Sequence, residues 1–280
     1  MNECTEEKYQ AKGVVVFGLG RTGIEITKHL DNLNVFFLDN QYSGLQFSGQ
    51  ENVILLKESS GILNPFNAQY RVKSQEDRIK KIIKNRVLFV VCGADDQRGL
   101  HISIACEVVN FAKKNEVPVI GFIKNPDRTN SVIESKMQEL KDKLNYTYFY
   151  KGAVGEDIDY LEQIVHKNNE LEKIIKKMAL MLEDDIMNRQ PIISEKLEYL
   201  IIDNILDANE DFNDLKQQLL MKQSSNYKCR ITICTSGENA SYKRGFYETE
   251  IRRVWSGISF VYWGESDDSN KVQIIFMFYK

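Results

Sequence analysis

A glycine-rich turn between a strand and a helix is the feature that most constrains this chain. A β-branched run at residues 14–17 leads into Gly18-Leu-Gly-Arg-Thr-Gly23, and Ile26 and Leu30 then recur at helical spacing. The order strand, glycine turn, helix favours a parallel α/β sheet. Glycines in such a turn let backbone N–H groups and the positive end of the helix approach an anionic phosphate. The turn therefore predicts a phosphate-binding site that needs no side-chain chemistry.

The alternation of strand-like and helix-like segments continues through the first half of the chain. Buried-type strands are predicted at residues 35–38, 52–56, 87–91 and 117–123, and helices at residues 69–84 and 102–112. We therefore predict a doubly wound, mostly parallel sheet of the Rossmann-like α/β class.

The second half has a different pattern. An apolar stripe from Leu171 to Leu182 predicts a long helix that Pro191 would break, and a second helix is predicted from Ile193 to Ile205. Alternating strands at residues 229–235, 258–263 and 272–278, with a helix at residues 248–254, predict a small α+β domain. The predicted organisation is a nucleotide-binding-type domain at residues 1–158, a helical connector at residues 159–208 and the small domain at residues 209–280.

Composition excludes several classes of protein. Against 40 Asp and Glu there are 37 Lys and Arg, so the net charge of −3 lacks the basic excess of a dedicated nucleic-acid binder. The 5 cysteines form no C-x-x-C pair, which argues against a zinc site or a disulfide framework. No signal peptide and no run of about 18 apolar residues is present. We expect a cytoplasmic protein that binds no nucleic acid and is not inserted in a membrane.

An acidic residue after the second strand leaves one alternative open. Asp39 follows Gly18 by 21 positions, where a carboxylate can accept a hydrogen bond from a ribose hydroxyl of a dinucleotide. On these two features a Rossmann-type NAD-binding enzyme or sensor is an alternative, which predicts that Asp39→Ala abolishes NAD binding. The sequence offers no matching acid–base group for hydride transfer.

The order of the motifs resembles the tubulin/FtsZ superfamily over nearly the whole chain. The turn at residues 18–23 is similar to that family's first phosphate loop, and residues 39–41 lie where FtsZ has Asn-Thr-Asp ahead of a Gln. Residues 60–65, Ser-Gly-Ile-Leu-Asn-Pro, resemble its Asn-Pro loop. Residues 209–214, Asn-Glu-Asp-Phe-Asn-Asp, resemble the segment by which one FtsZ subunit completes the GTP site of its neighbour.

This resemblance implies binding of GTP or GDP, with Mg²⁺ as an accompanying ion, and self-association or engagement of a related filament protein. Asp211 and Asp214 would polarise water in trans at a subunit interface, as a GTPase requires. The nucleotide contacts that the resemblance implies are Gly18, Gly20, Arg21, Thr22, Gly23, Asp39, Gly61, Asn64, Gly93 and Gly99.

Two departures from the family pattern predict that nucleotide use is weakened or lost. The family's glycine-rich signature loop is here Gly93-Ala-Asp-Asp-Gln-Arg-Gly99, and its two carboxylates oppose an anion unless a metal or Arg98 intervenes. The guanine-reading aspartate of the family's central helix is replaced by Ala179 or Leu180. A pseudo-GTPase, or a non-catalytic interaction module that uses the altered loop as a protein-binding surface, follows as a further alternative.

The histidines suggest no catalytic or metal site. His29, His101 and His166 lie on three separate predicted elements, and no Ser-His-Asp or Cys-His spacing is present. Asp95 and Asp96 form a carboxylate pair that could accompany Mg²⁺, but a solvated loop is the favoured interpretation. No protein metal site is predicted.

Overall fold

A computed structural model gives the fold as two compact units, Met1–Gln190 and Pro191–Lys280. The structure describes residues 13–30, 33–40, 52–56, 67–94, 99–126, 130–150, 160–187, 197–205, 213, 216–217, 219–220, 228–235, 239–255, 258–265 and 272–279.

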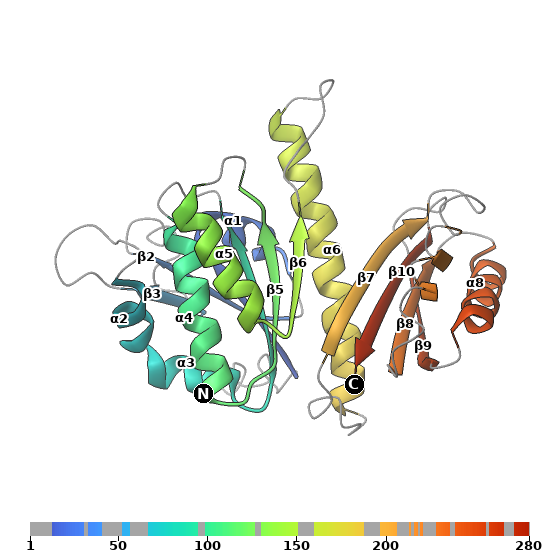
Figure 1. The fold of residues 1–280 in the computed structure, drawn as a ribbon, viewed down its shortest axis with the longest axis horizontal. Coiled ribbons are helices and arrows are strands. Elements are labelled where there is room, and N and C mark those ends of the chain that lie inside the picture. Colours follow the sequence, from blue (N-terminus) through green and yellow to red (C-terminus); the bar gives the residue numbers. More distant parts are fainter. Residues whose placement is uncertain are drawn as a thin grey trace, which may run out of the picture. The chain divides into compact units, whose positions relative to one another are not determined.

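The first unit is built on a six-stranded sheet (Figure 1). Its strands are β1 (Val14–Leu19), β2 (Asn34–Asn40), β3 (Val53–Leu56), β4 (Val87–Gly93), β5 (Val119–Lys124) and β6 (Tyr146–Tyr150). They lie in the order β3-β2-β1-β4-β5-β6, and every neighbouring pair is parallel. The predicted doubly wound, parallel α/β sheet is confirmed.

Helices cover both faces of this sheet, as a parallel sheet requires. The helices are α1 (Gly20–Thr27), α2 (Ala68–Lys73), α3 (Glu76–Ile83), α4 (Leu100–Lys114), α5 (Ser131–Lys143) and α6 (Tyr160–Met187). Helices α2 to α5 pack together on one face, and α1 packs with α6 on the other (Figure 1). Strands β1 and β4 are buried along their whole length, which explains their continuous apolar sequences.

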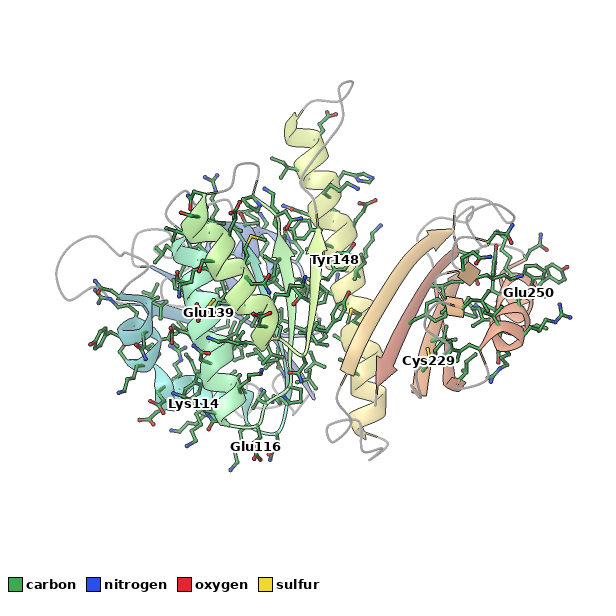
Figure 2. The ribbon with its side chains drawn as sticks, in the orientation of Figure 1. Lys114, Glu116, Glu139, Tyr148, Cys229 and Glu250 are labelled. Atoms are coloured by element: carbon green, nitrogen blue, oxygen red, sulfur yellow. The ribbon has the colours of Figure 1, made fainter. Side chains whose placement is uncertain are left out.

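Three details of this unit differ from the prediction or extend it. The single helix predicted over residues 69–84 is two helices, α2 and α3, which are separated by Ser74 and Gln75. Helix α5 and strand β6 have no counterpart in the sequence interpretation. In the edge strand β6, Tyr146 and Tyr148 are half-buried, and this burial raises the pKa of both side chains (Figure 2).

The second unit is a four-stranded sheet with a helix against it. It contains β7 (Leu197–Ile205), β8 (Lys228–Thr235), α8 (Ala240–Val254), β9 (Ile258–Glu265) and β10 (Val272–Tyr279), with strand order β7-β10-β8-β9. The core lies between α8 and the apolar residues of β8 and β10, and includes Tyr247, Ile251 and Phe276. On α8, Glu250 pairs with Lys216 at 2.7 Å, which fastens the segment before β8 to the helix (Figure 2). The predicted α+β character of this region is confirmed.

The connector prediction is wrong for its second half. Residues 160–187 do form a long helix, α6, but the segment from Leu197 to Ile205 is strand β7 and not a helix. Leu197, Leu200 and Ile201 have a helical spacing, yet residues 197–205 pair antiparallel with β10. Because that partner lies far along the chain, the tertiary pairing overrides the local pattern.

Candidate functional site

The candidate site lies where the strand order of the first unit reverses. Strand β1 lies between β2 and β4, and the chain continues outward in opposite directions from this point. In open parallel sheets, ligands bind outside the carboxyl ends of the strands at such a switch point. Helix α1 begins at Gly20 directly after β1, and α4 begins after Gly99. The structure thus brings two of the predicted glycine turns to one edge of the sheet.

Both helix starts have a left-handed glycine and no side-chain cap. Gly20 has φ +63° and Gly99 has φ +67°, and neither N-cap residue, Leu19 of α1 or Gly99 of α4, caps its helix with a side chain. By contrast, α5 is capped by Asn130, whose Oδ1 accepts from the Ile133 N–H at 2.9 Å. An uncapped first turn presents N–H groups and the positive helix end to an anion. Helices α2, α3 and α8 also lack a side-chain cap, so it is the position at the switch point that suits these two turns to phosphate.

Two glycines of the first turn are required by packing. A Cβ on Gly23 would lie 2.2 Å from the Val91 carbonyl oxygen in β4, so this glycine lets α1 approach the sheet closely. A Cβ on Gly18 would lie 2.3 Å from Thr27 Oγ1 and 2.9 Å from the Gly23 oxygen. Gly18 and Gly23, both predicted site residues, are therefore explained by the close packing of the turn.

The second glycine faces a histidine that the sequence interpretation left without a role. A Cβ on Gly20 would lie 2.4 Å from His101 Cδ2, so the imidazole covers the open side of this glycine. His101 Nε2 is 3.9 Å from Asp39 Oδ1, and the Asp39 side chain is only 1% exposed. Sequence spacing could not link these residues, because Asp39 lies next to the last residue of β2 whereas His101 belongs to the first turn of α4. The sequence signal that could have pointed to His101 is its position directly after Leu100, close to the predicted nucleotide contact Gly99.

The position of Asp39 bears on the NAD alternative. Its carboxylate is buried at the end of β2 with the His101 ring beside it. A ribose hydroxyl would need an exposed carboxylate at this position. The geometry of Asp39 does not provide one.

The other predicted contact residues divide into three groups. Arg21 is exposed and Thr22 is half-buried on the first turn of α1. Gly93 is the buried last residue of β4, in register with Lys124 of β5. Outside the described residues lie the predicted positions Gly61, Asn64, Asp211 and Asp214, together with Asp95, Asp96 and Arg98 of the altered loop.

The candidate base-reading position in α6 is apolar and covered. Ala179 is fully buried, as is the neighbouring Met178. An alanine methyl offers no acceptor for the N–H groups of guanine. This helix therefore contributes packing, with α1 and β1 as its neighbours.

Other reactive groups are withdrawn from solvent. The described cysteines Cys92, Cys106, Cys229 and Cys234 are all buried, and burial raises the pKa of Cys106 to about 12. A thiol with such a pKa is not a nucleophile at neutral pH. Within the described ranges no group of three or more His, Cys, Asp or Glu side chains could hold a metal ion. No helix there is both long and apolar enough to cross a bilayer.

Comparison with known proteins identifies the fold. No protein-family model matches the chain, and no curated protein matches it significantly. Among solved structures, an FtsZ dimer from M. jannaschii matches with TM-score 0.68 at 12% identity, covering 98% of this chain and 90% of that chain. CetZ from Methanosaeta thermophila matches with TM-score 0.60 at 13% identity, covering 96% and 86%. A GTPγS-bound protofilament of CetZ2 from Haloferax volcanii matches with TM-score 0.57 at 12% identity, covering 94% and 92%.

Proposed function

We propose that this chain, which has the fold of the tubulin/FtsZ proteins and is divergent in sequence, binds the phosphates of a nucleotide at its glycine turn and self-associates head to tail. One observation carries the proposal: two helices with left-handed glycines at their starts, Gly20 and Gly99, begin together at the switch point of the sheet. That arrangement concentrates backbone N–H groups and the positive ends of two helices at one place.

The first turn of α1 supplies the proposed phosphate contacts. Its N–H groups have no side-chain acceptor at the cap, and the exposed Arg21 adds a full positive charge beside them. An arginine can contact two phosphate oxygens at once. Thr22 adds a hydroxyl on the same turn. Diphosphate and triphosphate ligands therefore suit this turn better than neutral ligands.

We expect the base to be read only weakly. Ala179 is buried and cannot accept a hydrogen bond from guanine, so the affinity comes mainly from the phosphates. GDP and ADP should therefore bind with dissociation constants within about tenfold of each other, a difference of about 1.4 kcal/mol. A site with a buried acceptor for guanine would discriminate much more strongly.

Self-association is proposed from the fold relatives and from the sequence. The FtsZ structure is a dimer, and the CetZ2 structure is a protofilament with bound GTPγS. A head-to-tail interface that does not close into a ring produces an open filament. Asp211 and Asp214 enter only through the sequence resemblance, as residues that would act in trans on the nucleotide of the next subunit.

Isothermal titration with GDP, GTP and ADP, together with sedimentation velocity, tests the proposal. Arg21→Ala should weaken GDP binding by about 10- to 100-fold, since a charged hydrogen bond contributes roughly 1.5–3 kcal/mol. Lys28→Ala is the matched control, because it removes the same charge from the far end of α1, where Lys28 pairs with Glu25. The control should bind GDP like the unaltered protein.

Assembly and hydrolysis are measured in the same samples. GTP should increase the sedimentation coefficient, and Asp211→Ala and Asp214→Ala should abolish phosphate release while GDP binding persists. If millimolar GDP and GTP change neither the titration heat nor the sedimentation of the unaltered protein, the proposed function is wrong and the relationship is one of fold only.

A further inference from the structure

We infer that His101 is a side-chain gate over the phosphate side of the glycine turn, and that an incoming phosphate group must displace its ring. This inference rests on the proposed function, because it concerns the same turn. It assigns to His101, a residue that sequence reasoning left without a role, control over the affinity for phosphate.

The His101 ring takes the space that the second glycine leaves open. A Cβ on Gly20 would meet Cδ2, Cγ and Nδ1 of His101 at 2.4, 2.5 and 2.6 Å. In turns of this type, the second glycine lacks a side chain so that a pyrophosphate can approach the backbone. Here the imidazole is in that position. A phosphate group cannot fit between the ring and the Gly20 backbone, so the two occupants exclude each other.

The first glycine and the third serve as an internal comparison. A Cβ on Gly18 would lie 2.3 Å from Thr27 Oγ1, and a Cβ on Gly23 would lie 2.2 Å from the Val91 oxygen. Both contacts are inside the packed body of the unit. Thr27 is buried, and the Val91 contact is with strand backbone. At Gly20 alone of the three, the obstructing atoms belong to a partly exposed side chain that can rotate. Of the three, only the obstruction at Gly20, the His101 ring, can be removed by a side-chain rotation.

The surroundings of His101 hold the ring in the closed position. Its backbone is fixed in the first turn of α4, and its Nε2 lies 3.9 Å from the buried Asp39 Oδ1. The side chain is 19% exposed, compared with 69% for His166, so one edge of the ring reaches solvent. Rotation about two side-chain bonds can move the ring without moving the helix. Opening therefore requires a rotamer change and the loss of contact with Gly20.

The gate reduces the apparent affinity by the fraction of molecules in which it is open. If the ring is displaced in about one molecule in ten, removal of the ring strengthens binding about tenfold. His101→Ala should therefore lower the dissociation constant for GDP by about tenfold or more. Alanine also suits a helical position, so α4 should keep its start.

A matched variant separates ring volume from ring chemistry. His101→Phe keeps a planar ring at the same place but cannot donate a hydrogen bond to phosphate. It should bind GDP no more tightly than the unaltered protein. His29→Ala, which removes an exposed histidine after the end of α1, serves as the control and should leave the dissociation constant unchanged. Melting temperatures of all variants show whether each is folded.

The results separate the gate from the proposed function. Tighter GDP binding by His101→Ala, with no gain for His101→Phe, supports the gate. Equal or weaker binding by His101→Ala overturns it; if the unaltered protein binds GDP in that case, the ring is a phosphate ligand or a bystander and the proposed function stands. Absence of GDP binding in both proteins overturns the gate and the nucleotide site together.

A measurement on the unaltered protein does not depend on any variant folding. When GDP is added, the His101 ring resonances in an NMR spectrum should move toward those of the exposed His29 as the Gly20 amide resonance shifts. A shift of the Gly20 amide with unchanged His101 resonances would show that phosphate binds while the ring stays in place, and would overturn the gate.

Discussion

Two helix starts at the same edge of the sheet share a backbone conformation but differ in their surroundings. Gly20 and Gly99 have φ angles of +63° and +67°, so both positions favour glycine. A Cβ on Gly99 would meet Ile102 Cγ2 at 3.6 Å, an ordinary contact, whereas a Cβ on Gly20 would overlap the His101 ring. The same residue type is therefore required by conformation alone at one start and by conformation and space at the other.

The two helices share one further detail, at the end of the short helix α1 and in the first turn of α4. Thr27 Oγ1 donates to the Gly23 oxygen at 2.7 Å, and Ser103 Oγ donates to the Gly99 oxygen at 2.8 Å. Each helix thus ties a hydroxyl to a glycine carbonyl four residues earlier. The two glycines therefore differ in the side chain that faces them, which is the His101 ring at Gly20 and Ile102 at Gly99. Substitutions that add one methyl group should reveal this difference.

The largest effect is expected for Gly23→Ala. Its Cβ would lie 2.2 Å from the Val91 carbonyl oxygen, which is backbone of the buried strand β4 and cannot rotate away. Helix α1 would have to move off the sheet, so we expect a loss of about 4 kcal/mol or more in the free energy of unfolding. Urea denaturation followed by circular dichroism measures it. A loss below about 1 kcal/mol would show that α1 packs less closely than the structure indicates.

Gly20→Ala should have a smaller effect that depends on His101. A left-handed alanine costs about 1–2 kcal/mol, and the forced displacement of the His101 ring adds about 1–3 kcal/mol. In a His101→Ala background the second contribution disappears, so the cost of Gly20→Ala should fall to about 1–2 kcal/mol. A double-mutant cycle of unfolding free energies measures this coupling.

If Gly20→Ala lowered the free energy of unfolding by the same amount in the unaltered protein and in the His101→Ala background, the comparison between the two starts would be wrong. That result would mean that His101 does not touch Gly20 in solution. Arg21→Ala, on the exposed side of the same turn, is a control that should change stability by less than about 0.5 kcal/mol.

The glycine turn itself could be predicted from sequence, because every signal for it is local. The β-branched strand, the three glycines and the helical spacing of Ile26 all lie within a short segment, and the structure has β1 and α1 there. The apolar stripe of α6 was equally local, and Leu171, Ile175 and Met178 are buried. Where local periodicity and tertiary packing agree, the sequence is sufficient.

The parts that sequence could not predict depend on distant partners. Strand β7 has the apolar spacing of a helix, but β10 supplies its hydrogen bonds. The gate residue was missed for the same reason: His101 meets Gly20 and Asp39 only because the parallel sheet places the ends of β1 and β2 beside the start of α4. Fold class follows from local pattern, whereas the contents of the site follow from topology.

Gly99→Ala should lower the free energy of unfolding only through the left-handed backbone conformation at this position. Among the described residues no atom outside its chain neighbours lies closer than 3.6 Å to the Cβ position, so the left-handed backbone is the obstacle and we expect a loss of about 1–2 kcal/mol. Gly99→Asn should cost less, because asparagine tolerates this conformation. Thermal unfolding of both variants checks the order. A larger loss for Gly99→Ala than for Gly20→Ala would reverse the comparison between the two starts.

The smallest effect is expected just after the C-terminal end of α4, where a residue other than glycine is replaced by glycine. Glu116 has φ +58° just after the helix ends at Lys114, so a glutamate occupies the conformation that glycine favours (Figure 2). Glu116→Gly relieves about 1–2 kcal/mol of strain and loses about 0.4–1 kcal/mol to the greater freedom of the unfolded chain, which leaves a gain of about 0.5–1 kcal/mol. Glu116→Ala, which keeps the Cβ, should give no such gain. If the two variants had equal stability in urea denaturation, the free-energy cost assigned to the left-handed backbone at Gly99 and Gly20 would be wrong.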